Sequence, residues 1–463
     1  MVILVFVIAV IPAGMGFLAT SHYQQLVDHL NQRDEVNLEV IKQQRGWLSS
    51  DVVLQINISD AFHRKLVKIL PVSAITSPFY LKSRIFHGPF PYAEGEPTIK
   101  LLVSHSTHRI VNSLKTNQSV LPANYTLVAN FHFNGNQVIE FNIESLEQPL
   151  IANQYRVDWR TMSGVIELNS NSKQMNIHAK VPFIEINSPT SHVLIDSLLV
   201  DSETENGIED LVFGSTRVSM RRFLMNDLSS VLNLFLKEVN IQAESIARES
   251  MVDIHANMSM TNVGFADEHF GKGEFNLVLR NLDAGVIARV GKKYQESPDF
   301  DTLPEDQVKI LLASMLLMET TNFLQTGPEI ELVSMRLVGD PGTFKGHAKI
   351  TIDNSEPQLL SNLLSVQQAI QAKVRFAIPE SILVSYHTGL LKLENAKAKL
   401  KAVTPKLRAL ARARVKKYMA PFVDNKLLRY ADKMYLFDAR FENGELLVNG
   451  QPINFPVNTK LIE

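Results

Sequence analysis

Residues 126–143 read TLVANFHFNGNQVIEFNI, and this stretch decides the fold class. Apolar side chains recur at every second position on both sides of the dipeptide Asn134-Gly135, as in Leu127, Ala129 and Phe131. A period of two places successive side chains on opposite faces of a β-strand, and Asn-Gly suits the tight turn of a hairpin. The stretch therefore predicts two antiparallel strands with one apolar and one polar face.

The same two-residue period recurs along the chain. It predicts that 165–168 pairs with 175–181, and it occurs again near the end in FENGELLV at 441–448. Asn-Gly dipeptides begin at positions 134, 206, 443 and 449. Short connections of this kind favour antiparallel strands, because parallel strands need long crossovers. We expect a β-rich body of long, mostly antiparallel curved sheets.

Four segments of the second half show apolar spacing near three and four residues instead, which is typical of amphipathic helices. They are 221–247, 304–323, 357–371 and 394–432. Proline at 304 and glycine at 327 suit the start and the end of the second of these helices. The predicted fold class is α+β, with amphipathic helices interspersed among the strands.

The first segment, Met1 to Thr20, contains no charged side chain and is long enough to cross the hydrocarbon layer of a bilayer. We interpret residues 1–20 as a retained transmembrane anchor. A cleaved signal peptide is the alternative, because Ala19-Thr20-Ser21 offers small residues for cleavage before His22. After the anchor, we predict a β-rich domain over 21–220 and a mixed domain of helices and strands with a terminal hairpin over 221–463.

Composition excludes several classes of protein. The 463 residues are 45% hydrophobic and 20% charged, and the net charge is −2. These values are typical of a globular body and give no overall field that attracts nucleic acid. The chain has no cysteine, which excludes disulfides, thiol nucleophiles and thiolate metal sites.

Motifs that carry catalysis are not found in the sequence. Nucleophile elbows, phosphate loops, dinucleotide fingerprints and zinc-protease spacings do not occur. His105 and His108 would share one face of a helix but lie on opposite faces of a strand, and no carboxylate pair accompanies them. We therefore predict no catalytic residue, no cofactor and no metal site.

Residues 392–417 form a basic stretch, with ten Lys and Arg residues against one acid, Glu394. Apolar residues recur within it at three- and four-residue steps, so the predicted helix has a basic face. A solvated surface helix is one interpretation, and contact with anionic lipid headgroups is the other. The residues that we predict for a lipid contact are Lys406, Arg408, Arg412, Arg414, Lys416 and Lys417.

Several short motifs, spread over the chain, carry a family resemblance. They are Arg45-Gly46-Trp47-Leu48-Ser49-Ser50, His87-Gly88-Pro89-Phe90-Pro91, Trp159 with Gly164-Val165-Ile166, and the terminal stretch from Phe441 that ends in Leu447 to Pro452. Together they resemble the YdgA/YihF-type family of bacterial envelope proteins. That resemblance implies a single inner-membrane anchor, a body that faces the periplasm, and no established activity or cofactor.

Two functions follow as hypotheses. The first is a non-enzymatic, membrane-anchored envelope protein that binds lipid or another apolar ligand, or that scaffolds an envelope partner. The alternative is a periplasmic hydrolase with a dispersed active site. The expected partners are the membrane and lipid, with no nucleic acid; the sequence identifies no protein partner.

Overall fold

The computed structural model describes residues 36–59, 78–88, 102–111, 124–146, 150–152, 155–170, 173–227, 232–296, 319–355, 363–397 and 404–453, with residue 91 and a few positions before residue 36. The chain divides into two compact units. Unit 1 comprises residues 1–189, 198–205 and 295–302, and unit 2 comprises 190–197, 206–294 and 303–463. Strand β11 (Ser191–Asn206) supplies residues to both units.

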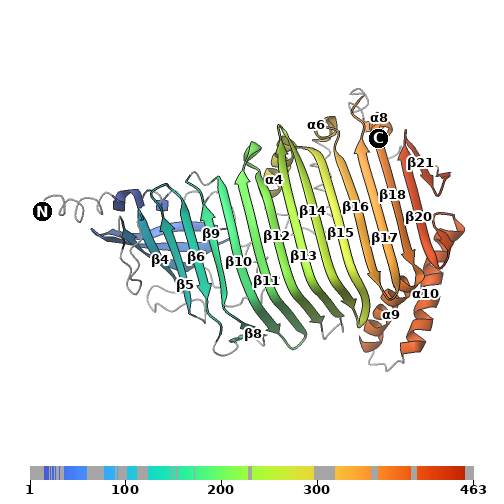
Figure 1. Ribbon diagram of the computed structural model, residues 1–463, viewed down its shortest axis with the longest axis horizontal. Coiled ribbons are helices and arrows are strands. Elements are labelled where there is room, and N and C mark those ends of the chain that lie inside the picture. Colours follow the sequence, from blue (N-terminus) through green and yellow to red (C-terminus); the bar gives the residue numbers. More distant parts are fainter. Residues whose placement is uncertain are drawn as a thin grey trace. The chain divides into compact units, whose positions relative to one another are not determined.

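Unit 1 is built on antiparallel strands that lie side by side in Figure 1. They are β1 (Val36–Arg45), β2 (Ser49–Ile58), β3 (Phe79–His87), β4 (Ser104–Val111), β5 (Tyr125–Phe131), β6 (Gln137–Ile143), β7 (Leu150–Ala152), β8 (Tyr155–Trp159), β9 (Met162–Leu168) and β10 (Gln174–Asn187). The hairpin predicted from 126–143 is confirmed, because β5 and β6 pair from Tyr125↔Ile143 to Phe131↔Gln137. The second predicted pairing is confirmed in β9 and β10, where Leu168 lies opposite Met175.

Unit 2 is a broad antiparallel sheet of longer strands (Figure 1). Its strands are β12 (Val212–Asp227), β13 (Leu232–Arg248), β14 (Met251–Phe265), β15 (Glu268–Asp283), β16 (Glu329–Gly339), β17 (Gly342–Ile352), β18 (Ile370–Pro379), β19 (Arg429–Ala431), β20 (Met434–Glu442), β21 (Glu445–Val448) and β22 (Gln451–Ile453). The terminal hairpin is confirmed, since Glu442 pairs with Glu445 around Asn443-Gly444. Both turn residues have positive φ, 54° and 78°, which Asn and Gly tolerate best.

The helices of unit 2 connect strands that follow one another in the chain. They are the 3₁₀ turn η2 (Ile208–Asp210), α4 (Ala284–Glu296), α6 (Thr320–Gln325), α8 (Leu363–Ala369), α9 (Glu380–Lys397) and α10 (Thr404–Asp424). The helix predicted over 304–323 lies mostly outside the described residues. The segments predicted over 357–371 and 394–432 are helical only in part, since β18 begins at Ile370 and β19 occupies 429–431.

The helix predicted over 221–247 is wrong, because these residues form the end of β12 and most of β13. The helical spacing rests on residues such as Phe223, Leu224, Phe235, Val239 and Ile246. Each of these five has a partner on β12, β13 or β14 in the antiparallel register. Pairing on both sides of the strand outweighs the weak local preference for helix.

The predicted fold class needs a correction at the N-terminus. Residues 1–14 of the predicted anchor lie outside the described residues, and 15–19 are helical. No helix among the residues that the structure describes is both long and apolar enough to cross a membrane. The longest of them, α10, has 21 residues but carries Lys and Arg along its length. The described part of the chain is therefore predominantly antiparallel sheet, and the predicted N-terminal transmembrane helix is not supported.

Candidate functional site

One face of the unit 2 sheet is apolar across its whole width. Residues directly opposite one another on neighbouring strands share a face, so the strand register defines rows that run across the sheet. The central row is Val218, Ile241, Met258, Phe275, Met335, Gly346, Phe376 and Phe437. The neighbouring row is Thr216, Ala243, Ala256, Leu277, Leu332, Ala348, Val374 and Ala439. We call these two rows the apolar face; neither contains a charged residue.

Part of this apolar surface is open to solvent. Ile241 is 39% exposed and Met335 is 42% exposed, although both lie in the middle of long strands. In the next row along the same strands, Ile330 and Ile350 lie opposite each other and are exposed by 42% and 40%. At one end of the central row, the rings of Phe376 and Phe437 stack with centroids 4.7 Å apart.

The described helices contact this side of the sheet near the strand ends. Ile254 and Leu279 pack against a cluster that includes Ala284 at the start of α4. At the opposite ends of the strands, Tyr435 joins a cluster with Val384 of α9 and residues of α10. None of the hydrophobic clusters among the described residues includes a member of the apolar face. Among the described residues, these clusters therefore lie towards the ends of the strands and not on the two rows.

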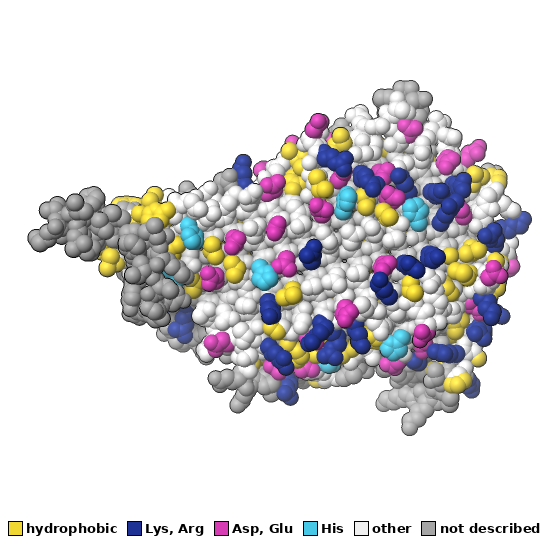
Figure 2. Space-filling view, in the orientation of Figure 1, with side chains coloured by type: hydrophobic (Ala, Val, Ile, Leu, Met, Phe, Trp, Pro, Cys, Tyr) yellow, Lys and Arg dark blue, Asp and Glu magenta, His cyan; other side chains and the backbone are white. Residues whose placement is uncertain are grey.

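The other face of the same strands is polar. The row one residue away from the central row runs through Ser219, Asn240, Ser259, Glu274, Arg336 and Lys345. Figure 2 shows a face of the molecule on which Lys, Arg, Asp and Glu side chains are scattered over the surface. Strict alternation therefore makes this single sheet amphipathic.

Unit 1 contains a partly covered counterpart of this surface. A pocket of about 230 Å³ is lined mainly by apolar side chains of β1 to β6, including Leu54, Leu81 and Ile139. Residues of the N-terminal helical region, Ala19 and Val27, cover it and are 4% and 3% exposed. The pocket lies between these residues and the sheet.

A chain of hydrogen bonds crosses the wall of the pocket. Ser106 Oγ donates to the carbonyl oxygen of Ala129 at 3.1 Å, so it accepts from Nε2 of His108 at 2.9 Å. His108 Nδ1 is then an acceptor, and the hydroxyl of Ser83 donates a hydrogen bond to it at 2.7 Å. Ser83 Oγ in turn accepts from the hydroxyl of Tyr23 at 3.0 Å. Each hydroxyl hydrogen has one acceptor, which fixes the direction of the chain.

His108 is neutral at physiological pH. Burial and, to a smaller extent, the neighbouring His105 together lower the pKa of His108 to about 4. A serine nucleophile needs a base that becomes charged and is stabilised by a third group. Here both ring nitrogens contact hydroxyl groups, so the arrangement satisfies polar groups in an apolar wall and does not activate Ser83. His105 and His108 lie on opposite faces of β4, as expected for a strand.

A second Ser–His contact lies nearby in unit 1. Ser50 Oγ lies 2.9 Å from Nε2 of His87, and Nδ1 of His87 lies 3.1 Å from the carbonyl oxygen of Trp47. Both residues are buried, and burial lowers the pKa of His87. Within the described part of the chain, no group of three or more His, Asp and Glu side chains can hold a metal ion.

The six basic residues predicted for a lipid contact all lie on α10, but they fall into two groups. The three arginines are paired with carboxylates: Arg408 with Glu268 at 3.3 Å, Arg412 with Glu380 at 3.5 Å, and Arg414 with Glu394 at 2.9 Å. Lys406, Lys416 and Lys417 are exposed, and no described carboxylate pairs with them.

Sequence reasoning missed the partners of the arginines because Glu268 and Glu380 lie outside the basic stretch. Glu268 also accepts from Nζ of Lys392 at 2.8 Å, so a carboxylate that is 5% exposed on β15 holds cations of α9 and α10. Much of the basic stretch therefore fastens the two helices to the sheet and to each other.

Comparison with curated proteins and with solved structures gives no match. A family model described as "Bacterial protein of unknown function (DUF945)" matches residues 1–456, which is nearly the whole chain. The protein with this amphipathic sheet therefore belongs to the bacterial DUF945 family.

Proposed function

We propose that this protein binds acyl chains of lipids, with the apolar face of unit 2 as the main binding surface. The observation that carries the proposal is the pair of uncharged rows, in which Ile241 and Met335 are about two-fifths exposed in the middle of the sheet. Soluble proteins rarely expose contiguous apolar surface without a partner. Each Å² covered by a ligand contributes roughly 25 cal/mol.

An acyl chain fits these surfaces better than a polar ligand or a folded segment does. The two rows offer no charged side chain that could orient a polar molecule. The pocket of unit 1, at about 230 Å³, lies just below the range of roughly 300 to 1,000 Å³ of typical small-molecule sites. A linear, flexible hydrocarbon can occupy both a narrow pocket and an open apolar face. The activity is binding, with no chemical step.

The proposal is tested with Ile241→Glu on the apolar face and Gln242→Glu on the polar face. The two residues are neighbours on β13, and both are exposed. We expect Ile241→Glu to weaken the binding of a fluorescent fatty acid by at least about tenfold, because its carboxylate would be desolvated against hydrocarbon. Gln242→Glu should bind as the unchanged protein does. Equal affinities of all three proteins, or no binding at all, would refute the proposal.

Contact with anionic headgroups through α10 is a separate part of this proposal. Lys406, Lys416 and Lys417 are exposed next to Leu410 and Tyr418, which are 50% and 54% exposed. Each lysine near an anionic surface contributes on the order of 1 kcal/mol. Mixed apolar and basic side chains on one helix are typical of membrane-surface contacts.

The test replaces Lys406, Lys416 and Lys417 by Gln and measures sedimentation with vesicles. We expect binding to anionic vesicles to fall roughly 100-fold, the equivalent of about 3 kcal/mol. The matched control replaces three exposed lysines of unit 1, Lys42, Lys173 and Lys180. An equal loss in the control, or binding that is insensitive to salt, would show that α10 makes no such contact.

We also propose a finer placement within the family and in the cell. The motifs at 45–50, 87–91 and 447–452 support the YdgA/YihF-type branch, which implies a body in the periplasm. The absence of cysteine is compatible with an oxidising compartment. Protease added to spheroplasts should degrade the protein while a cytoplasmic marker survives; protection of both would refute the placement.

A further inference from the structure

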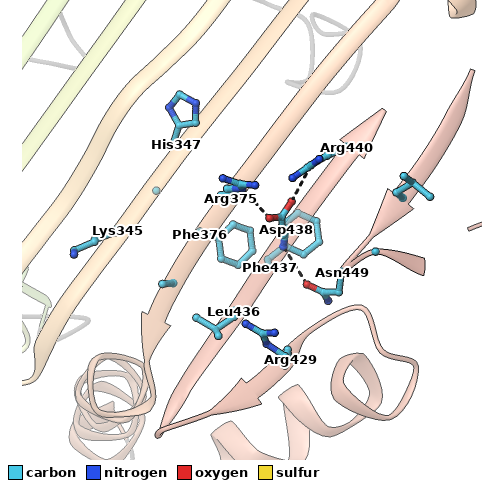
Figure 3. Close-up of a pocket in the computed structure, with 14 residues that line it drawn as sticks. Lys345, His347, Arg375, Phe376, Arg429, Leu436, Phe437, Asp438, Arg440 and Asn449 are labelled. Carbon is cyan, nitrogen blue, oxygen red and sulfur yellow. Dashed lines mark hydrogen bonds and ion pairs between the residues drawn. The ribbon is translucent and has the colours of Figure 1, made fainter. Parts of the chain in front are cut away.

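The polar face of unit 2 carries a hollow whose charge has no role in binding acyl chains. It has a volume of about 610 Å³ and lies over β17, β18, β20 and the short strands beside them (Figure 3). Its charged lining consists of Lys345, Arg375, Arg429, Arg440 and Asp438. Four permanent cations against one carboxylate leave an excess of three positive charges.

The strand register explains why the hollow exists. Lys345, Ala377, Leu436 and Arg429 lie directly opposite one another on four successive strands. Neighbouring strands are about 4.8 Å apart, so the two cations lie at the ends of a row roughly 14 Å long. The short side chain of Ala377 and the uncharged Leu436 form the floor between them. Long charged side chains at both ends, with an alanine and a leucine between them, produce a trough.

The cations at the ends of this row are not neutralised by the protein. No carboxylate of the described residues forms an ion pair with Lys345 or with Arg429, and both side chains are exposed. One step along the strands, Asp438 accepts from Nε of Arg375 at 2.7 Å and lies 3.7 Å from Nε of Arg440. These contacts use Nε (Figure 3), and among the described residues no hydrogen bond engages the terminal Nη groups of Arg375 or Arg440.

The rim of the hollow is held by specific hydrogen bonds. Asn449 Oδ1 accepts from the backbone N–H of Asp438 at 3.2 Å, and its Nδ2 donates to the carbonyl oxygens of Lys426 and Leu427. The backbone N–H of Asn449 donates to the carbonyl oxygen of Asp438 at 2.7 Å. These bonds fix the turn at Asn449 beside Asp438. Asp438 in turn positions Arg375 and Arg440.

We infer that this hollow binds a ligand with two adjacent phosphate groups. Arginine pairs with phosphate through two parallel hydrogen bonds, which the Nη groups of Arg375 and Arg440 can supply. One phosphomonoester carries about −1.5 to −2 charges at neutral pH, so two phosphates match the excess of three positive charges. The ligand is a soluble diphosphate or the diphosphate headgroup of a lipid.

The test measures binding of inorganic pyrophosphate by titration calorimetry to the full chain. We expect Lys345→Gln combined with Arg429→Gln to weaken binding at least about tenfold, since each removes a charge-assisted contact. Neither residue is in an ion pair with a described carboxylate, so the folded structure should persist, and circular dichroism checks this. Arg217→Gln, an exposed arginine on the same face but outside the hollow, is the matched control.

Vesicles separate the two sources of the ligand. Phosphatidylcholine vesicles with and without diacylglycerol pyrophosphate are compared for recruitment of the protein. Recruitment only by the pyrophosphate lipid, lost in the double variant, assigns the headgroup; binding of free pyrophosphate without recruitment assigns a soluble ligand. No binding of either, or an equal loss in Arg217→Gln, overturns the inference. Neither result depends on Ile241, so this test fails or succeeds independently of the acyl-chain proposal.

Discussion

The pocket of unit 1 and the apolar face of unit 2 come from the same alternating pattern but differ in what covers them. In unit 1, Ala19 and Val27 of the N-terminal helical region lie over the sheet and partly cover a pocket of about 230 Å³. In unit 2, the described helices contact the sheet near the ends of its strands, and Ile241 and Met335 remain exposed. An amphipathic sheet thus creates an apolar surface. The elements that pack on this surface decide whether it becomes a core, a pocket or an open binding face.

The largest expected effect concerns the covered pocket in acid. The pKa of His108 is about 4 in the folded protein and near 6.5 in the unfolded chain, so the unfolded chain binds a proton first as the pH falls. Its contribution to stability is complete above pH 6.5 and is lost as the pH falls from 6.5 to about 4. The loss reaches at most about 3 kcal/mol.

Urea unfolding at a series of pH values measures this loss. His108→Gln should show a flatter decline of the free energy of unfolding between pH 6.5 and 4 than the unchanged protein. His132→Gln, in the loop after β5, controls for the removal of a histidine. Parallel pH profiles for His108→Gln and the unchanged protein would mean that the side chain of His108 is already accessible to water in the folded protein.

A medium effect distinguishes the two faces of the open sheet. Phe376→Ala removes a ring that stacks on Phe437 at 4.7 Å, and we expect it to lower the free energy of unfolding by about 2 kcal/mol. Arg375→Ala, its neighbour on the polar face, removes an exposed ion pair with Asp438 and should cost less than about 1 kcal/mol. Chemical denaturation of the two variants checks the order; a reversed order would place the stabilising contacts on the polar face.

The smallest effect is expected at the cover of the pocket. Tyr23→Phe deletes the hydroxyl that donates to Ser83 Oγ and leaves the ring in place. The loss should be about 1 kcal/mol in the free energy of unfolding, the usual net value of one hydrogen bond. Thermal unfolding of Tyr23→Phe measures it, with Tyr80→Phe on β3 as a control for removal of a tyrosine hydroxyl. A loss no larger than that of the control would exclude Tyr23 as an anchor of the cover.

The sequence predicts the pairing of strands that are adjacent in the chain well. It predicts poorly which face of a sheet is covered by other elements. Alternation around Asn134-Gly135 and Asn443-Gly444 identifies two hairpins, because the residues that pair are close in the chain. The sequence pattern of 221–247 predicts a helix because its apolar spacing is ambiguous, although the partners of these residues on β14 follow directly after a two-residue turn. The apolar face itself requires the register of eight strands, which no local pattern specifies.

The candidate site shows the same limit. The basic residues of α10 could be found from composition, but not the pairing of Arg408 with Glu268, which is 140 residues away in the chain. The hollow on the polar face was not predicted either, because Lys345, Arg375 and Arg429 come from three separate strands. Its only sequence signal is the high density of Lys and Arg at alternate positions of β17 and β18.

The most direct test of the account asks which face of unit 2 meets hydrocarbon. The chain has no cysteine, so Ile350→Cys on the apolar side and Lys349→Cys on the polar side can each carry a single fluorophore. A fatty acid with a nitroxide on its chain is then added, and quenching is measured. The account predicts strong, saturable quenching at position 350 and little at position 349. Equal quenching at both positions, or quenching only at 349, would contradict the assignment of the apolar face as the binding surface.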